Sequence, residues 1–483
     1  MKNLYCILAL LLLSTQFSQA RIREVGAGRE FSRLQAAASG AQPGDTILIR
    51  EGVYSGGDFV SNLQGMAEAW ITIRAADGES VIFRGNSQAF HLSDPAYVRI
   101  KGLVFEGQTG NGVNIDDAAT FETPAHHIIF ENCEWRSMNA TGNNDELKMS
   151  GVDTFTVRNC RFLNGSPGGS MIDMVGCHEG TFEDNYFENG GSNCIQAKGG
   201  TKNITIQRNF FKNGGARALN IGGSTGLQFF RDDNPTYEAA QIRVYANVFE
   251  GSMTPIAFVG AVNCEVVNNT IIRPERWAIR ILQETTESGF LSCGNNTFRN
   301  NIVVFGNTGQ PAINIGPNTA PETFTFSNNL WFNPDNTSWS GPNTPVSELS
   351  RILNQDPQFA GTNYLLKETS PAIGKGFTMS EPKTDFFKKP FSANRSIGAI
   401  EAETISGIAN NDIQVEFLKI SPNPAHDELS LFVRTNSDVI ILDISGRKMW
   451  SGKVENIQLQ IAAWPAGVYF VQSGEIVKAF LKQ

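Results

Sequence analysis

Short segments in which apolar and polar residues alternate recur along most of the chain. Eight of them align on an Asn or Cys that stands two residues before an apolar side chain, giving the column Cys133, Cys160, Asn185, Asn209, Asn247, Asn269, Asn301 and Asn329. The shortest intervals in this column are 22 to 27 residues. A period of this length, built from alternating strands with Gly and Asn at the corners, is typical of one coil of a parallel β-solenoid.

A stacked column of asparagines has a physical use in such a fold. Each side-chain amide can bond the coils above and below it and so satisfy buried turn groups. Cys133 and Cys160 are expected in the same column as small apolar residues, with a disulfide as the alternative. The signatures of leucine-rich and propeller repeats are absent, so these architectures are disfavoured.

A second column sets which side chains face inward. Short apolar strands end at Gly151, Gly176, Gly199, Gly222, Gly260 and Gly316, and Gln283 takes this place in one coil. Residues four and two positions earlier are expected to face the core, among them Met149, Met174, Ala197 and Asn220. Residues one, three and five positions earlier are then expected to face solvent, among them Glu146, Arg217, Leu219 and Ile221.

The two ends of the repeat differ from its middle. Residues 30–57 predict a short amphipathic helix, a Pro-Gly-Asp turn and a strand, and a helix over the first coil would protect its open edge. Residues 356–376 and 396–401 predict irregular closing coils. The repeat domain is placed at 21–401, followed by a linker at 402–414 and an antiparallel β-sandwich domain at 415–483.

Residues 1–20 are interpreted as a signal peptide, because a lysine precedes a short apolar run and Ser18-Gln-Ala20 forms a small-residue cleavage site. No other stretch is long enough for a membrane span, so we expect an exported protein. The net charge of −9 and the lack of a basic tract argue against a nucleic-acid partner. An acidic polysaccharide stays possible as a partner, since a local basic patch is enough to bind it.

The repeat region, over roughly 25–400, resembles the right-handed parallel β-helix superfamily that includes pectate lyases, chondroitinase B and alginate lyases. The segments SPNPAHDEL, DISGR and AGVYFV near the C-terminus resemble the sorting domain of the type IX secretion system. These resemblances imply an all-β fold and export to the cell surface or the medium, through the periplasm and the type IX machinery. Activity does not follow from the fold, because function depends on the site that the fold carries.

The outward columns bring ionisable residues together in one region. Adjacent coils lie about 4.8 Å apart, so Lys148, Asp173, Gln196 and Lys198 are expected in a single outward patch. Glu146 and Arg217 are expected on one flank of the patch, and His178 and Asp153 on the other, around the corner.

For β-elimination from a uronic acid, Lys198 is the predicted base, with Arg217 and Gln196 gripping the carboxylate and His178 as an alternative acid or base. The segment NCIQAKGG matches the lysine strand of the chondroitinase B and alginate lyase family in position, although Asn193 stands where that family has an acid. Further predicted substrate-binding residues are Lys148, Asp173, Arg231, Arg280, Phe229 and Tyr237. The last four come from long insertions or distant coils. Asp173, Glu146 and Asp145 are the candidate ligands for Ca²⁺, which has no certain site.

Three functions stay open at this point. The first is a secreted lyase acting on a uronate-containing glycan. The second is a glycoside hydrolase, which needs two carboxylates across the bond, such as Asp173 with Glu146 or Asp153. The third is a non-catalytic glycan-binding solenoid, in which Lys198, Arg217 and His178 do not converge.

Overall fold

The computed structural model describes residues 20–402, apart from 121 and 232, and residues 418–482, apart from 422, 423, 444, 445, 474 and 475. The expected signal peptide and linker, except Ala20 and Ala402, lie outside the described residues. The chain divides into two compact units, Met1–Glu403 and Thr404–Gln483. No helix in the described part is long and apolar enough to cross a membrane.

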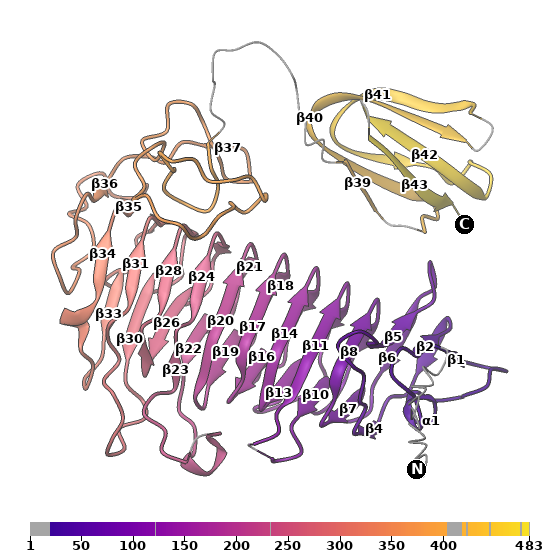
Figure 1. Cartoon of the computed structure of the whole chain (residues 1–483). Helices are drawn as coiled ribbons and strands as arrows, with labels where there is room; N and C mark the ends of the chain where they lie inside the picture. Colours follow the sequence, from indigo (N-terminus) through magenta and orange to yellow (C-terminus); the bar gives the residue numbers. More distant parts are fainter. Residues whose placement is uncertain are drawn as a thin grey trace, which may run out of the picture. The chain divides into compact units, whose positions relative to one another are not determined.

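Three parallel sheets run along the first unit, and each coil contributes a strand to each sheet (Figure 1). Sheet C, which carries the predicted site, consists of β4 (Asp58–Ser61), β7 (Phe90–Ser93), β10 (Val113–Asp116), β13 (Leu147–Ser150), β16 (Ser170–Val175), β19 (Asn193–Lys198), β22 (Arg217–Gly222), β26 (Ile256–Val259), β30 (Ile279–Leu282) and β33 (Ile313–Ile315). This arrangement is the expected parallel β-helix.

The other two sheets complete each coil. Sheet A contains β1 (Ile22–Val25), β2 (Thr46–Ile49), β5 (Ile71–Ala75), β8 (Ala96–Lys101), β11 (Ala125–Glu131), β14 (Val152–Arg158), β17 (His178–Glu183), β20 (Thr201–Gln207), β23 (Ala239–Ala240), β24 (Arg243–Tyr245), β27 (Ala261–Val262), β28 (Glu265–Val267), β31 (Thr297–Arg299) and β34 (Thr325–Ser327). Sheet B contains β3 (Gly52–Tyr54), β6 (Val81–Arg84), β9 (Val104–Glu106), β12 (Glu134–Arg136), β15 (Arg161–Leu163), β18 (Tyr186–Glu188), β21 (Phe210–Lys212), β25 (Val248–Glu250), β29 (Thr270–Ile272), β32 (Ile302–Val304), β35 (Leu330–Phe332) and β36 (Ile352–Leu353).

The asparagine column forms a continuous buried ladder at the turn between sheets A and B. The backbone N–H and the side-chain amide of Asn185 both donate to Asn209 Oδ1 at 3.0 Å, and Asn209 donates in the same way to Asn247. Cys160 occupies the column with a free thiol, and its N–H donates to Asn185 Oδ1 at 2.9 Å. The ladder satisfies the buried turn groups, which fixes the stacking of the coils.

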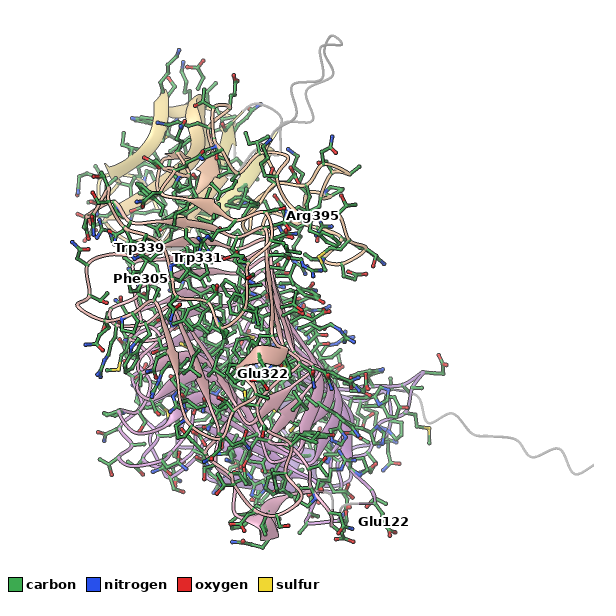
Figure 2. All side chains as sticks on the ribbon, turned by 90° about the vertical axis from the view of Figure 1, so that its left-hand side faces the viewer. Glu122, Phe305, Glu322, Trp331, Trp339 and Arg395 are labelled. Carbon is green, nitrogen blue, oxygen red and sulfur yellow. The ribbon has the colours of Figure 1, made fainter. Side chains whose placement is uncertain are left out.

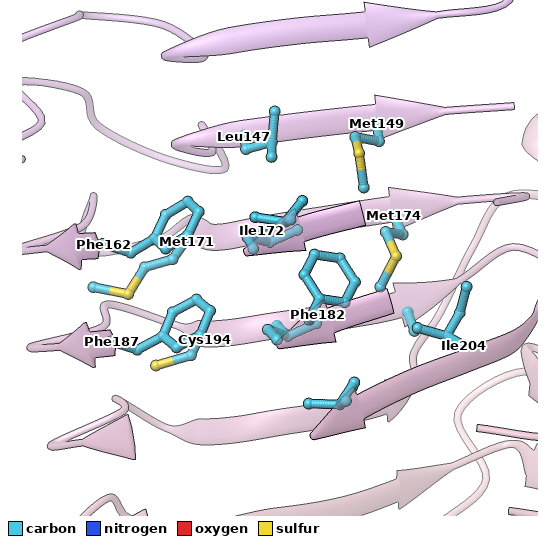
Figure 3. Close-up of a cluster of buried hydrophobic side chains, with 14 of the residues drawn as sticks. Leu147, Met149, Phe162, Met171, Ile172, Met174, Phe182, Phe187, Cys194 and Ile204 are labelled. Carbon is cyan, nitrogen blue, oxygen red and sulfur yellow. The ribbon is translucent and has the colours of Figure 1, made fainter. Parts of the chain in front are cut away.

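The core consists of the inward side chains of the three sheets. Figure 3 shows part of it, where Leu147, Met149, Ile172 and Met174 of sheet C face the interior together with Phe182 of sheet A. Aromatic side chains stack in register along sheet B, from Trp135 through Phe162, Phe187 and Phe211 to Phe249, with centroids 4.6 to 4.9 Å apart. Burial on this scale is the main stabilising term of the fold.

The expected helix covers the first coil. α1 (Leu34–Ala38) buries Leu34, Ala37 and Ala38 against β1, β2 and β4. At the other end, Phe305 stacks on Trp339 at 5.7 Å, and Figure 2 shows both near Trp331.

The segment after β36 departs from the closing coils that the sequence predicts. It contains the short antiparallel pair β37 (Phe359–Ala360) and β38 (Leu365–Leu366) and then folds back along sheet B of earlier coils. There, Asn268 Nδ2 donates to the carbonyls of Ser396 and Gly398 at 2.9 Å.

The second unit is an antiparallel sheet of β39 (Leu418–Ser421), β40 (Glu428–Asp443), β41 (Lys448–Gln460), β42 (Gly467–Ser473) and β43 (Ile476–Lys482). The long strand β40 pairs with β39, β41 and β42, and its pairing with β41 shifts register between Phe432 and Ser437. This unit has its own core, which includes Leu431, Ile441 and Val471.

The strand register corrects two coils of the sequence alignment. In the coil of β33, Asn314 pairs with the outward Arg280, so Gly316 is not the corner residue. The other correction is in the coil of β22. Leu219 and Ile221 pair with Ile195 and Ala197 and lie in the core, whereas Asn220 pairs with Gln196 on the outward column. These faces are the reverse of the expected ones, because the period puts the corner at Gly222 and the register puts it at Gly223. A shift of one residue moves every side chain of a strand to the opposite face.

Candidate functional site

The outward side of sheet C brings Lys148, Asp173 and Lys198 into direct contact. Lys148 and Asp173 are register partners on β13 and β16, and their side chains form an ion pair. Lys198 Nζ, at the end of β19, lies 3.4 Å from the same Asp173 carboxylate oxygen. The Asp173 side chain is only 1 % exposed, and its other oxygen is buried without a hydrogen-bond partner. One buried carboxylate therefore positions both lysine side chains.

Asp145 adds a second carboxylate beneath this pair. Asp145 Oδ2 lies 3.7 Å from Lys148 Nζ, and Asp145 Oδ1 accepts a hydrogen bond from the Ser170 N–H at 2.8 Å. Burial, together with the charge of Asp173, raises the pKa of Asp145 to about 6. Burial disfavours the charge of Lys148, but Asp173 and Asp145 outweigh it and hold the pKa of Lys148 above its ordinary value.

Gln196 lies beside Asp173 on the next coil. Its carbonyl oxygen accepts hydrogen bonds from Ser170 Oγ at 3.3 Å and from Asn193 Nδ2 at 3.4 Å. Because the oxygen is held in this way, the orientation of the amide is fixed, and its nitrogen is the group left to donate. Asn193 therefore has a supporting role for Gln196.

Arg217 and Arg280 extend the outward face of sheet C beyond Gln196. Arg217 donates to Asn220 Oδ1 at 2.9 Å and to Glu284 Oε1 at 2.8 Å. Arg280 is three coils beyond Gln196, as expected, donates to Asn314 Oδ1 at 3.1 Å and lies over the ring of Trp277. Burial and the neighbouring Arg217 lower the pKa of Arg280, while Glu284 opposes this shift. The Glu284 carboxylate thus occupies a position between two arginines.

Glu146 does not lie on the flank of this patch. Its side chain is fully buried, both carboxylate oxygens lack a hydrogen-bond partner, and burial raises its pKa well above the ordinary range. It adjoins the core thiol of Cys194, whose pKa is also raised by burial and by Glu146. The expected outward position of Glu146 is wrong because its whole column faces inward: Met171 and Cys194, at the same position on the next two coils, also lie in the core.

The carboxylates of this patch do not fit a calcium site. Ca²⁺ requires six to eight oxygen ligands, and of the three candidates Glu146 faces the core. Asp145 and Asp173 already hold the Lys148 ammonium between them, so a divalent cation there would meet like charge. Within residues 20–402 and 418–482, as far as they are described, no group of three His, Cys, Asp or Glu side chains could hold a metal ion.

His178 and Arg231 lie around the corner from Lys198, on the outward side of sheet A. Asp153, His178 and Lys202 are register partners on three consecutive coils. Arg231, from the insertion after β22, forms two hydrogen bonds with Asp153 at 2.5 and 2.9 Å and donates to His178 Nδ1 at 3.1 Å. The predicted site residues therefore divide into two groups. The separation of His178 from Lys198 and Arg217 is what the non-catalytic alternative predicts for this residue, so a catalytic role would have to rest on the sheet C group alone.

This contact fixes the chemistry of His178. An arginine can only donate, so Nδ1 of His178 carries no proton and Nε2 carries it. Burial and Arg231 lower the pKa of His178 to about 4, against the opposing effect of Asp153. With Nδ1 occupied by Arg231, the neutral His178 ring can only donate a hydrogen bond through Nε2. This argues against His178 as the acid or base of the reaction.

The comparisons with known proteins agree with this architecture. Residues 71–271 match the family described as right handed beta helix region, and residues 419–480 match the secretion system C-terminal sorting domain. The chain is a right-handed parallel β-helix with a C-terminal sorting domain. The expected resemblance to the type IX sorting tail is thereby confirmed, and this tail supports export to an extracellular or cell-surface location. Among curated proteins, none matches the chain.

Several solved structures are similar in fold at low sequence identity. An alginate lyase from Paenibacillus sp. str. FPU-7 is 16 % identical, with a TM-score of 0.41, over 62 % of this chain and 96 % of its own. The pectate lyase Pel9A is 15 % identical, with a TM-score of 0.40, over 80 % and 97 %. A lacto-N-biosidase from Eubacterium ramulus is 12 % identical, with a TM-score of 0.41, over 69 % and 67 %. The neighbours thus include both lyases and a glycosidase.

Two of the remaining candidate residues lie in the same insertion. Phe229 ends the short helix η1 (Leu227–Phe229) and is 62 % exposed. Its neighbour Phe230 is buried and packs against Phe290, which belongs to the second long insertion, between β30 and β31. Tyr237 lines a cavity on the side of sheet A rather than the face that carries Lys198. The insertion therefore contributes to both faces of the corner.

The sequence pattern does not identify Glu238, which links the segments at the turn between sheets C and A after Lys198. Its carboxylate is fully buried and accepts hydrogen bonds from the N–H of Gly199 at 3.0 Å, the N–H and hydroxyl of Thr225 at 2.8 Å, and the hydroxyl of Thr285. Glu238 thereby ties the residue after Lys198 to both long insertions. An acidic residue next to Ala239-Ala240 was the only signal, and charged residues at loop ends are common.

Proposed function

We propose that the protein is an exported polysaccharide lyase that cleaves a uronate-containing glycan by β-elimination, with Lys198 as the base. The observation that carries the proposal is the position of Lys198 Nζ, 3.4 Å from the buried Asp173 carboxylate on the outward face of sheet C. A base of this reaction needs a fixed orientation within reach of the proton beside the sugar carboxylate. Asp173 supplies that orientation without exposing its own charge to the substrate.

In the proposed reaction, the neutral Lys198 amine takes the proton next to the carboxylate. The carbon–oxygen bond to the leaving sugar breaks, a carbon–carbon double bond forms, and the ammonium so produced returns the proton to the leaving oxygen. Arg217 binds the substrate carboxylate by exchanging its contact with Glu284, since a guanidinium pairs with carboxylates through two parallel hydrogen bonds. The Gln196 amide nitrogen donates to a sugar hydroxyl beside Lys198. No step requires a metal.

Hydrolysis on the same face is less well supported. It requires two carboxylates on either side of the bond, and the sequence analysis considered Asp173 with Glu146 or Asp153. Glu146 lies in the core, and Asp153 is held by Arg231 around the corner. Asp173 itself is buried beneath two lysines.

The test is turnover of a panel of acidic polysaccharides, including alginate, polygalacturonate and chondroitin sulfate, followed by the ultraviolet absorbance of the unsaturated uronate. General base catalysis contributes roughly 10²- to 10⁴-fold, so Lys198→Ala is expected to lower the rate by at least 10²-fold. Lys212→Ala, which removes a surface lysine paired with Glu188 on sheet B, is the matched control and is expected to be fully active. New reducing ends without the absorbance band would favour hydrolysis, and cleavage of none of the polysaccharides would favour binding alone.

A further inference from the structure

A cavity of about 840 Å³ lies on the outward side of sheet A, around the corner from Lys198. One wall comes from the loop after β10, with Thr120 and Glu122, and the other from the insertion after β22, with Arg231, Asp233 and Tyr237. Its floor consists of His178 and Lys202 on β17 and β20. Figure 2 shows Glu122 at the outer margin of the β-helix, where this wall reaches solvent.

The floor presents two hydrogen-bond donors side by side. His178 and Lys202 are register partners on adjacent coils, which places them about 4.8 Å apart along the sheet. Arg231 occupies His178 Nδ1, so Nε2 carries the proton. This N–H is directed at the Gly200 carbonyl, and a ligand in the cavity shares it with that carbonyl. Among the described residues, Lys202 has no ion-pair partner within 4 Å, unlike Lys148 and Lys198 on the other face. Asp153 neutralises Arg231 through two hydrogen bonds, so the unpaired positive charge on the floor is that of Lys202.

The rim has the opposite chemistry. Glu122 and Asp233 are exposed carboxylates, and Thr120 and Thr123 add hydroxyl groups. A ligand that suits both levels carries an anionic group for the floor and several hydroxyl donors for the rim, because carboxylates accept hydrogen bonds and lysine ammonium groups donate them. A free inorganic anion would meet the charge of the Glu122 and Asp233 carboxylates at the rim, and a neutral sugar would leave Lys202 without a counter-charge.

We propose that this cavity binds an acidic sugar unit, with the anionic group held by Lys202 and His178 Nε2 and the ring hydroxyls by Glu122 and Asp233. It is a second glycan site, separate from the Lys198 face, and it has no base. The shared chemistry is an anionic substituent on a sugar ring, which is either a carboxylate or a sulfate ester. The site does not depend on the proposed elimination and would exist equally in a non-catalytic glycan-binding protein.

The test uses ligand-observed NMR titrations at neutral pH in a Lys198→Met background, which disables the other face. The probes are sodium glucuronate, glucose 6-sulfate, methyl glucoside and inorganic sulfate. We expect glucuronate or glucose 6-sulfate to bind at least fivefold more tightly than methyl glucoside and inorganic sulfate, and the stronger of the two identifies the anionic group. Adding Lys202→Met, which keeps the aliphatic stem and removes the charge, is expected to weaken that binding at least fivefold.

Lys212→Met in the same background is the matched control and is expected to change nothing. Equal binding of methyl glucoside and the acidic sugars would overturn the proposal, as would acidic-sugar binding that Lys202→Met leaves intact. His178→Gln gives an independent check, because its amide can replace Nε2–H as a donor and should retain more binding than His178→Ala. Thermal unfolding of each variant verifies that the fold is kept. If no acidic sugar binds the cavity but Lys198→Ala loses turnover as expected, the second site is refuted and the proposed lyase function is retained.

Discussion

Replacing Glu146 with Met is expected to stabilise the β-helix. The Glu146 side chain is fully buried, and neither carboxylate oxygen has a hydrogen-bond partner. It lies within the apolar core that contains Met171 and Cys194. A buried polar group without a partner costs about 1–3 kcal/mol. Methionine has a similar length and a flexible apolar end that fills irregular core space, so most of that cost should be recovered.

The gain should depend on pH, and its sign follows from the raised pKa of Glu146. The folded state holds the Glu146 proton more tightly than the unfolded chain, whose carboxyl has a pKa of about 4.3. Below about pH 4.3 Glu146 is protonated in both states, and its effect on stability does not change with pH. Above that value the free energy of unfolding falls as pH rises toward the pKa of Glu146 in the folded state. Each pH unit in this range costs about 1.4 kcal/mol, so the advantage of the Met variant should widen between pH 5 and pH 8.

The assay is thermal and urea unfolding of wild type, Glu146→Met and Glu146→Gln at pH 5 and pH 8. The Gln variant keeps an uncharged polar group without partners, so it should lose the pH dependence and gain less stability than Met. Asp145, whose pKa is also raised, is present in all three proteins and cancels in the comparison. An unfolding midpoint of the Met variant below wild type at pH 8, or an equal gap at both pH values, would refute the reasoning.

Three further predictions concern the outward face of sheet C and the corner beside it. A chelator should leave turnover of the wild-type protein unchanged. The Lys148→Asp variant places a third carboxylate beside Asp145 and Asp173, so Ca²⁺ should raise its melting temperature but not that of wild type. Glu284→Gln should lower KM for the uronate substrate severalfold, because Arg217 no longer holds a competing carboxylate; an unchanged KM would place substrate elsewhere. Glu238→Gln should cost about 3 kcal/mol in unfolding experiments, since charge-assisted hydrogen bonds are worth about 1.5–3 kcal/mol each, whereas Glu275→Gln should be neutral.

The sequence was sufficient for the coil, because the repeat determines it through contacts that every coil makes. The asparagine ladder needs the same residue type at the same turn, and the aromatic stack of sheet B needs a large apolar residue two positions later. The outward contact of Lys148, Asp173 and Lys198 follows from the same period, since their coils have no insertion. A regular repeat therefore predicts the positions of side chains on neighbouring coils.

The errors arose where the repeat is interrupted. β22 ends at Gly222 and a second glycine, Gly223, follows it. The period alone does not distinguish these two as the corner, so Asn220 was turned inward and Leu219 outward. Glu146 was assigned to solvent by the alternation of a strand that begins only at Leu147. The pairing of Arg231 with Asp153 spans 78 residues and depends on how a long insertion folds back, which no local pattern encodes.

The insertion after β22 also explains how one coil corner can serve two glycan sites. Arg231 in its middle fixes His178 on sheet A, and Glu238 at its end accepts from Gly199, the residue that follows Lys198 on sheet C. Gly200 in turn donates its N–H to the carbonyl of Glu238. Movement of this insertion would therefore disturb the floor of the cavity and the end of the Lys198 strand together. Glu238→Gln should therefore weaken binding at the cavity and slow turnover at Lys198 in the same variant, whereas Lys202→Met should affect the cavity alone.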